Sequence, residues 1–166
     1  MNGAPSSKQS QHLKDKYLYL SMYAELLLRC LSDVYHIPLP LFKIHRMYSG
    51  RICDGQFVSS GYIHDSTLCI SIPVGSKLKT LKEDLEITVL HEFAHYINFY
   101  NLRSPDRRKL DSYNYRTNRK YAQEDEILTW LRTKDAAKLL GLWNKITLKM
   151  CIHSGPYAAV LKVFPE

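Results

Sequence analysis

The sequence lacks the features that mark a membrane or secreted protein. No apolar run approaches the roughly 20 residues of a membrane-spanning helix, and residues 1–11 lack the apolar segment of a secretion signal. None of the cysteines, Cys30, Cys53, Cys69 and Cys151, forms a C-x-x-C pair, which excludes a zinc ribbon or knuckle. Scattered cysteines without a signal are predicted to be reduced thiols. These absences predict a cytoplasmic protein with no membrane partner.

The length and composition are those of one globular domain. The chain has 166 residues, enough for one hydrophobic core, and 45% of them are hydrophobic. Residues 1–11 are polar and include Gly, Pro and Ser, so they are predicted to form a disordered leader. Residues 12–166 are predicted to form a single domain.

Apolar spacing predicts an α+β fold with a small, mostly antiparallel sheet. A spacing of three to four residues indicates helices, whereas alternation indicates strands. The predicted helices are 13–35, a helix from about residue 80 to 100, and one from about Asn118 to Leu140, ended by Gly141; the predicted strands are 42–47, 56–63 and 67–72.

The chemically most informative stretch is His91-Glu92-Phe93-Ala94-His95, inside the predicted helix that ends at Tyr100. Residues four apart share a helix face, so the two imidazoles can hold one zinc ion. Glu92 beside them is the general base of this H-E-x-x-H pattern. The alternative is a structural helix with an accidental pair of histidines. Thr80 and Glu83 match a capping box, which favours a helix starting where the pattern needs one.

A catalytic zinc site usually has a third protein ligand. The positions three and six residues after His95 are Asn98 and Asn101, which excludes the extended metzincin pattern. The remaining nearby donors are carboxylates on the next predicted helix, namely Glu124, Asp125 and Glu126.

Glu126 is the favoured third ligand, because it precedes an apolar stripe able to pack on the motif helix. Glu124 is the second choice, and Asp125 leads to a more exposed face. Carboxylates that bind no metal are expected to stabilise the helix start instead. The stripe after Glu126 consists of Trp130, Thr133, Ala137 and Leu140.

The motif helix followed by residues 124–130 resembles the gluzincin family of zinc metallopeptidases. The chain is most similar to the compact minigluzincins and is close in pattern to the ImmA/IrrE-type peptidases. The resemblance implies a zincin-like domain with a motif helix and a following glutamate helix. It also implies Zn²⁺ held by His91, His95 and Glu126, and Glu92 as the base in peptide or protein hydrolysis. The sequence has Trp130 where thermolysin-like members have an acidic residue behind a ligand histidine.

The peptidase chemistry needs a substrate-binding strand and a donor that stabilises the oxyanion. Strand 67–72 is the candidate for holding an extended peptide, with an ordinary sheet edge as the alternative. The candidate donors are Tyr113, Tyr115, Tyr121 and His153.

A basic stretch, residues 103–120, holds seven Lys or Arg against two Asp and is predicted to be a solvated loop. Tyr113 and Tyr115 lie among these charges, a combination found on nucleic-acid-binding faces. The alternative function is therefore an inactive or regulatory zincin that acts as a binding module, with nucleic acid as the less favoured partner. An intact Glu92 argues against it, because a structural site needs no base.

Overall fold

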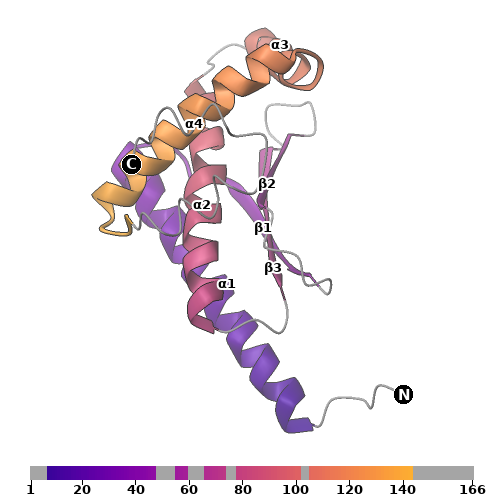
Figure 1. The fold of residues 1–166 in the computed structure, drawn as a ribbon, viewed down its shortest axis with the longest axis vertical. Helices are drawn as coiled ribbons and strands as arrows, with labels where there is room; N and C mark the ends of the chain where they lie inside the picture. Colours follow the sequence, from indigo (N-terminus) through magenta and orange to yellow (C-terminus); the bar gives the residue numbers. More distant parts are fainter. Residues whose placement is uncertain (1–6, 48–54, 60–65, 74–77, 102–104, 144–166) are drawn as a thin grey trace.

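A computed structural model describes residues 7–47, 55–59, 66–73, 78–101 and 105–143 (Figure 1). Helix α2 is the central element: it contacts the sheet, α1 and α4. The elements in chain order are α1 (Ser7–Tyr35), β1 (Leu41–Met47), β2 (Gly55–Ser59), β3 (Ser66–Pro73), α2 (Leu78–Asn101), α3 (Pro105–Thr117) and α4 (Arg119–Leu139).

Helix α1 starts earlier than predicted. It begins at Ser7, so residues 7–11 are helical and the predicted boundary of the disordered leader is wrong; residues 1–6 lie outside the described part. Extending an existing helix needs no new nucleus, which allows polar residues to continue it. Its core face is apolar, and the Tyr23 hydroxyl donates to Glu86 Oε1 at 2.6 Å, which joins α1 to α2. The buried residues of α1 include Leu20, Ala24, Leu27, Leu28 and Leu31.

The sheet is mixed rather than mostly antiparallel. Strand β3 lies between the other two strands: it is parallel to β1 and antiparallel to β2. The parallel register runs from Leu41 opposite Thr67 to Met47 opposite Pro73. Alternation within a strand is the same for either direction of pairing, so the sequence does not reveal the direction. The α+β class is confirmed, whereas the predicted sheet type is wrong.

The central place of β3 also contradicts its predicted role in holding substrate. A strand that binds an extended peptide must have a free edge. Both edges of β3 are already hydrogen-bonded, to β1 on one side and to β2 on the other. Instead, β3 supports α2 from the sheet, with Leu68 and Ile70 fully buried.

Helix α2 carries the His-Glu motif through the middle of the core. It begins at Leu78, two residues before Thr80, so Thr80 is a helical residue and not the predicted cap; it ends at Asn101, one residue after the predicted end at Tyr100. Because α2 is buried on nearly all sides, its apolar residues are not confined to one face. Its fully or nearly buried residues include Leu81, Leu85, Val89, Leu90, Phe93 and Ile97.

Most of the basic stretch is helical, which contradicts the predicted loop. Helix α3 covers 105–117, and Arg119 already belongs to α4. Pro105 is the first residue of α3, a position that proline favours because its missing N–H has no helical partner there. The side chains of Arg107, Arg116, Arg119 and Lys120 are exposed.

Helix α4 has the predicted ends. Asn118 is the N-cap, and its Oδ1 accepts the backbone N–H of Tyr121 at 3.1 Å. At the other end Gly141 has φ +67°, and the N–H of Leu142 bonds Ala137 O at 2.7 Å. This is a Schellman motif, in which glycine accommodates the left-handed residue. Among the described residues, no helix combines the length and apolar character needed to cross a membrane.

Candidate metal centre

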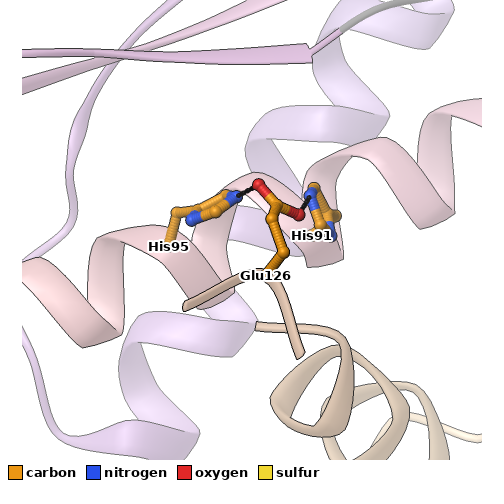
Figure 2. A group of neighbouring side chains, drawn as sticks. All are labelled: His91, His95 and Glu126. Carbon is orange, nitrogen blue, oxygen red and sulfur yellow. Dashed lines mark ion pairs between the residues drawn. The ribbon is translucent and has the colours of Figure 1, made fainter. Parts of the chain in front are cut away.

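Three donor side chains converge between α2 and α4 (Figure 2). His91 and His95 lie one turn apart on α2, and the Glu126 carboxylate of α4 reaches between their rings. Oε2 of Glu126 lies 3.4 Å from His91 Nε2, and Oε1 lies 3.1 Å from His95 Nε2. One ligand atom from each residue can be chosen so that all three lie within 4.8 Å of one another. The structure thus brings together the three residues that the sequence predicts as ligands.

The donor set fits a zinc ion. Zinc bonds of 2.0–2.2 Å in a tetrahedron place neighbouring donors about 3.4 Å apart, close to the two observed separations. Two imidazoles and one carboxylate are also a donor set of catalytic zinc, which leaves a position for water. Glu126 Oε2 is buried without a hydrogen bond, as is His91 Nδ1. A cation bound by the carboxylate would satisfy the first of these atoms.

The packing of α4 selects Glu126 among the three candidate carboxylates. Trp130, Thr133 and Ala137 are buried on the face that continues from Glu126, as the predicted stripe requires. Glu124 points to solvent instead, with 64% of its side chain exposed and Lys120 Nζ 3.8 Å away.

Asp125 is part of the centre, contrary to the prediction that it occupies an exposed face. Its Oδ2 lies 3.2 Å from His95 Nδ1, and the Thr129 hydroxyl lies 3.2 Å from the same nitrogen. Asn98 Nδ2 donates to both partners, at 3.3 Å to Asp125 and 3.0 Å to Thr129. A carboxylate on the second nitrogen of a ligating histidine fixes the tautomer and the ring orientation. This network leaves His95 Nε2 for the metal.

His91 has different surroundings. Its ring lies against the Trp130 indole, with centroids 4.3 Å apart and a tilt of 38°. Its Nδ1 is buried and makes no hydrogen bond. Trp130 therefore holds His91 by ring contact rather than by a hydrogen bond to its Nδ1.

The charges of the centre reflect this asymmetry. Burial lowers the pKa of His91 and outweighs the opposing effect of Glu126. Burial also acts to lower the pKa of His95, but hydrogen bonds with Asp125 and Glu126 outweigh it and raise this pKa to about 10. Burial would raise the pKa of Glu126, but its contacts with both histidines hold it well below the ordinary value. Without metal at neutral pH, the centre holds a neutral His91, a protonated His95 and an ionised Glu126.

Glu92, the predicted base, lies on α2 directly after His91. Its side chain is nearly buried, with 5% of the residue exposed, and its charge contributes to the raised pKa of His95. It is not one of the three donors that converge within 4.8 Å. A carboxylate beside the metal ligands but outside the donor set is suited to exchanging a proton with water.

Tyr115 of α3, one of the four candidate oxyanion donors, contacts two residues of the centre. Its hydroxyl donates to Glu126 Oε1 at 2.6 Å, and its ring meets the His95 ring edge-on with centroids 6.1 Å apart. Tyr113 is 61% exposed, and His153 lies outside the described residues. The helical form of 105–117 therefore has a consequence for the site, because it carries Tyr115 to the Glu126 carboxylate.

From the sequence, Asp125 was a candidate ligand on a more exposed face, and neither Thr129 nor Asn98 was predicted to belong to the centre. A usable signal was present, since Asn98 is a polar residue three positions after His95 and lies between the apolar residues Ile97 and Phe99. No protein-family model matches the chain, and no curated protein or solved structure is detectably similar to it.

Proposed function

We propose that the protein is a zinc-dependent peptidase of the gluzincin type, with His91, His95 and Glu126 as the metal ligands. The observation that carries the proposal is the approach of Glu126 to both imidazoles across the α2–α4 interface. The two helices bring together residues 31 positions apart in the chain, so local sequence alone does not explain their proximity. The position of Glu92 beside this donor set supports hydrolysis over a purely structural metal.

The reaction assigned to the site is hydrolysis of a peptide bond. When bound, a zinc ion supplies a water with a pKa of about 7 and polarises the substrate carbonyl. Glu92 takes the proton that the water loses as its oxygen attacks the carbonyl carbon. The same carboxyl group returns that proton to the amine as the C–N bond breaks. The Tyr115 hydroxyl, which donates to Glu126 Oε1 in the structure, gives up that bond and donates its one hydrogen to the oxyanion that develops on the carbonyl oxygen.

The test separates hydrolysis from metal binding. The full chain, loaded with zinc, is assayed on a library of unstructured peptides with mass-spectrometric detection of cleavage. Glu92→Ala is expected to bind zinc as the wild type does and to lose cleavage, since Glu92 serves the water and not the metal. A chelator should abolish wild-type cleavage, and added zinc should restore it. Equal cleavage by wild type and Glu92→Ala, or a wild type that binds zinc but cleaves none of the peptides, would favour the binding module.

A further inference from the structure

The face of α1 that points away from α2 carries an apolar stripe of its own. Leu18, Met22 and Leu26 recur every four residues, and they are 59%, 64% and 56% exposed. Single exposed apolar residues are ordinary, but a helix with apolar stripes on two opposite sides has a second surface to bury. The stripe buried against the core lies about 180° around the helix and consists of Leu20, Ala24, Leu27, Leu28 and Leu31.

Charged residues extend this exposed stripe symmetrically about Met22. Leu18 and Leu26 lie four residues before and after it, and Asp15 and Arg29 lie seven before and after. All five lie within about 40° of one line along the helix, and all five are exposed. Reversing the helix about Met22 therefore exchanges leucine with leucine and an acidic residue with a basic one.

We propose that the protein forms a homodimer in which α1 packs antiparallel on α1 of a second copy, with the twofold axis at Met22. In this arrangement Met22 meets Met22, and Leu18 meets Leu26 of the second copy. Asp15 lies opposite Arg29 at both ends of the contact. A twofold interface must be complementary to itself, and the exposed stripe of α1 meets this condition because it is symmetric about Met22. A parallel pairing would place Asp15 against Asp15 and Arg29 against Arg29, which like-charge repulsion disfavours.

The position of α1 in the fold permits this contact. The helix has 29 residues, about 43 Å, and its N-terminal half runs beyond the start of α2 and beyond the sheet (Figure 1). The stripe faces away from α2, so the contact does not use the surfaces that form the metal centre. From Asp15 to Arg29 it covers about four turns, or about 21 Å, which places the dimer in the weak, concentration-dependent class. The sequence alone leaves the oligomeric state open.

Sedimentation equilibrium of the full chain, under reducing conditions from about 1 μM to about 1 mM, tests the proposal. The wild type is expected to pass from monomer to dimer in this range. Met22→Glu should raise the dimer Kd at least about tenfold, because it places two carboxylates on the axis. Leu139→Glu is the matched control: Leu139 is 65% exposed on α4, and its substitution should leave the Kd unchanged.

A charge exchange tests the register and direction. Arg29→Asp alone and Asp15→Arg alone should each weaken the dimer at least about tenfold, since each makes two like-charge contacts. The double variant D15R/R29D should return to within about threefold of the wild type. Arg29 also pairs with Glu25 of its own helix at 2.7 Å, and the double variant does not restore that pair. Recovery would therefore come from contacts between copies.

Three outcomes would overturn the proposal. They are a wild type that is monomeric throughout the range, a dimer that Met22→Glu leaves intact, and single charge reversals that the double variant does not rescue. Circular dichroism and thermal unfolding of each variant keep the comparison valid, because the substituted side chains are exposed and the helix should persist.

Discussion

His91 and His95 lie one turn apart on the same helix, yet the protein surrounds them differently. His95 has Asp125 and Thr129 on its second nitrogen, and the Tyr115 ring lies at its edge. His91 has the Trp130 ring against it and no hydrogen bond on its Nδ1. Both rings approach the same carboxylate of Glu126. Two histidines of one motif can therefore lie in different electrostatic environments, with a carboxylate beside His95 Nδ1 and none beside His91 Nδ1.

If the centre binds a metal as proposed, the two histidines should contribute to binding in different ways. A hydrogen-bonded carboxylate makes His95 a more basic donor and fixes its tautomer. Ring contact with Trp130 restricts the orientation of His91 without adding charge. The His95 side should therefore control affinity and protonation, whereas the His91 side should control mainly packing.

The largest effect is expected from a substitution of Glu126, because its carboxylate approaches both His91 and His95. Glu126→Gln keeps the shape of the side chain and removes the charge, so zinc affinity should fall by more than about 100-fold, beyond the loss expected for an outer partner. His91→Ala or His95→Ala should lower it at least as far. Glu124→Gln is the matched control, since this side chain is 64% exposed, and it should bind zinc as the wild type does. Competition with a chromophoric chelator measures these affinities; weak binding by Glu124→Gln would contradict the assignment.

The next effect concerns Tyr115, which belongs to the His95 side. Tyr115→Phe should lower kcat by about 10²-fold, the usual consequence of losing one oxyanion donor, with zinc affinity reduced far less. The difference between kcat and metal affinity distinguishes catalysis from a structural role. Tyr113→Phe, at a residue 61% exposed on the same helix, should have no effect. Equal losses in the two variants would assign the effect to α3 in general.

A smaller effect compares the two histidines directly. Asp125→Asn should lower zinc affinity by about 10- to 100-fold, as is typical when the carboxylate behind a ligand histidine is removed. Trp130→Phe keeps an aromatic ring against His91 and should change the affinity much less. Isothermal titration calorimetry on the folded variants measures both. The reverse order of effects would show that the His91 side dominates.

The smallest expected effect is a pH dependence of the metal-free protein. His95 has a pKa of about 10, above the ordinary value of 6.5, so its protonated ring stabilises the fold fully below pH 6.5. This contribution is lost as pH rises toward 10, with a slope of at most about 1.4 kcal/mol per pH unit for one group. Urea unfolding of metal-free wild type and Asp125→Asn between pH 6.5 and 10 measures it. A wild type no more sensitive to pH than the variant would contradict the charge distribution described here.

Much of the helical framework could be predicted because its signals are local. Asn118 and Gly141 mark the ends of α4, and the apolar stripe after Glu126 predicts which carboxylate faces α2. Pairing direction in the sheet depends on partners distant in the chain, and alternation within 67–72 carries no information about it. Helix α3 has a highly charged sequence, so apolar periodicity could not reveal it, although Pro105 was a usable sign of a helix start.

The polar network behind His95 was harder to predict for a different reason. Thr129 is fully buried, and its hydroxyl forms hydrogen bonds with Asn98 and His95. Sequence periodicity treats Asp125 and Thr129 as polar and assigns them to the solvent face. Buried hydrogen-bonded groups follow from the three-dimensional arrangement of α2 and α4, which the sequence does not show directly.

The central claim is that one zinc ion joins α2 to α4 through three named residues. A crystal structure of the full chain with zinc, with anomalous diffraction recorded at the zinc absorption edge, tests it most directly. The predicted result is one anomalous peak, about 2.0–2.2 Å from His91 Nε2, His95 Nε2 and a carboxylate oxygen of Glu126. An absence of zinc from this position, or a zinc ion bound by His153 or Glu124 in place of Glu126, would contradict it.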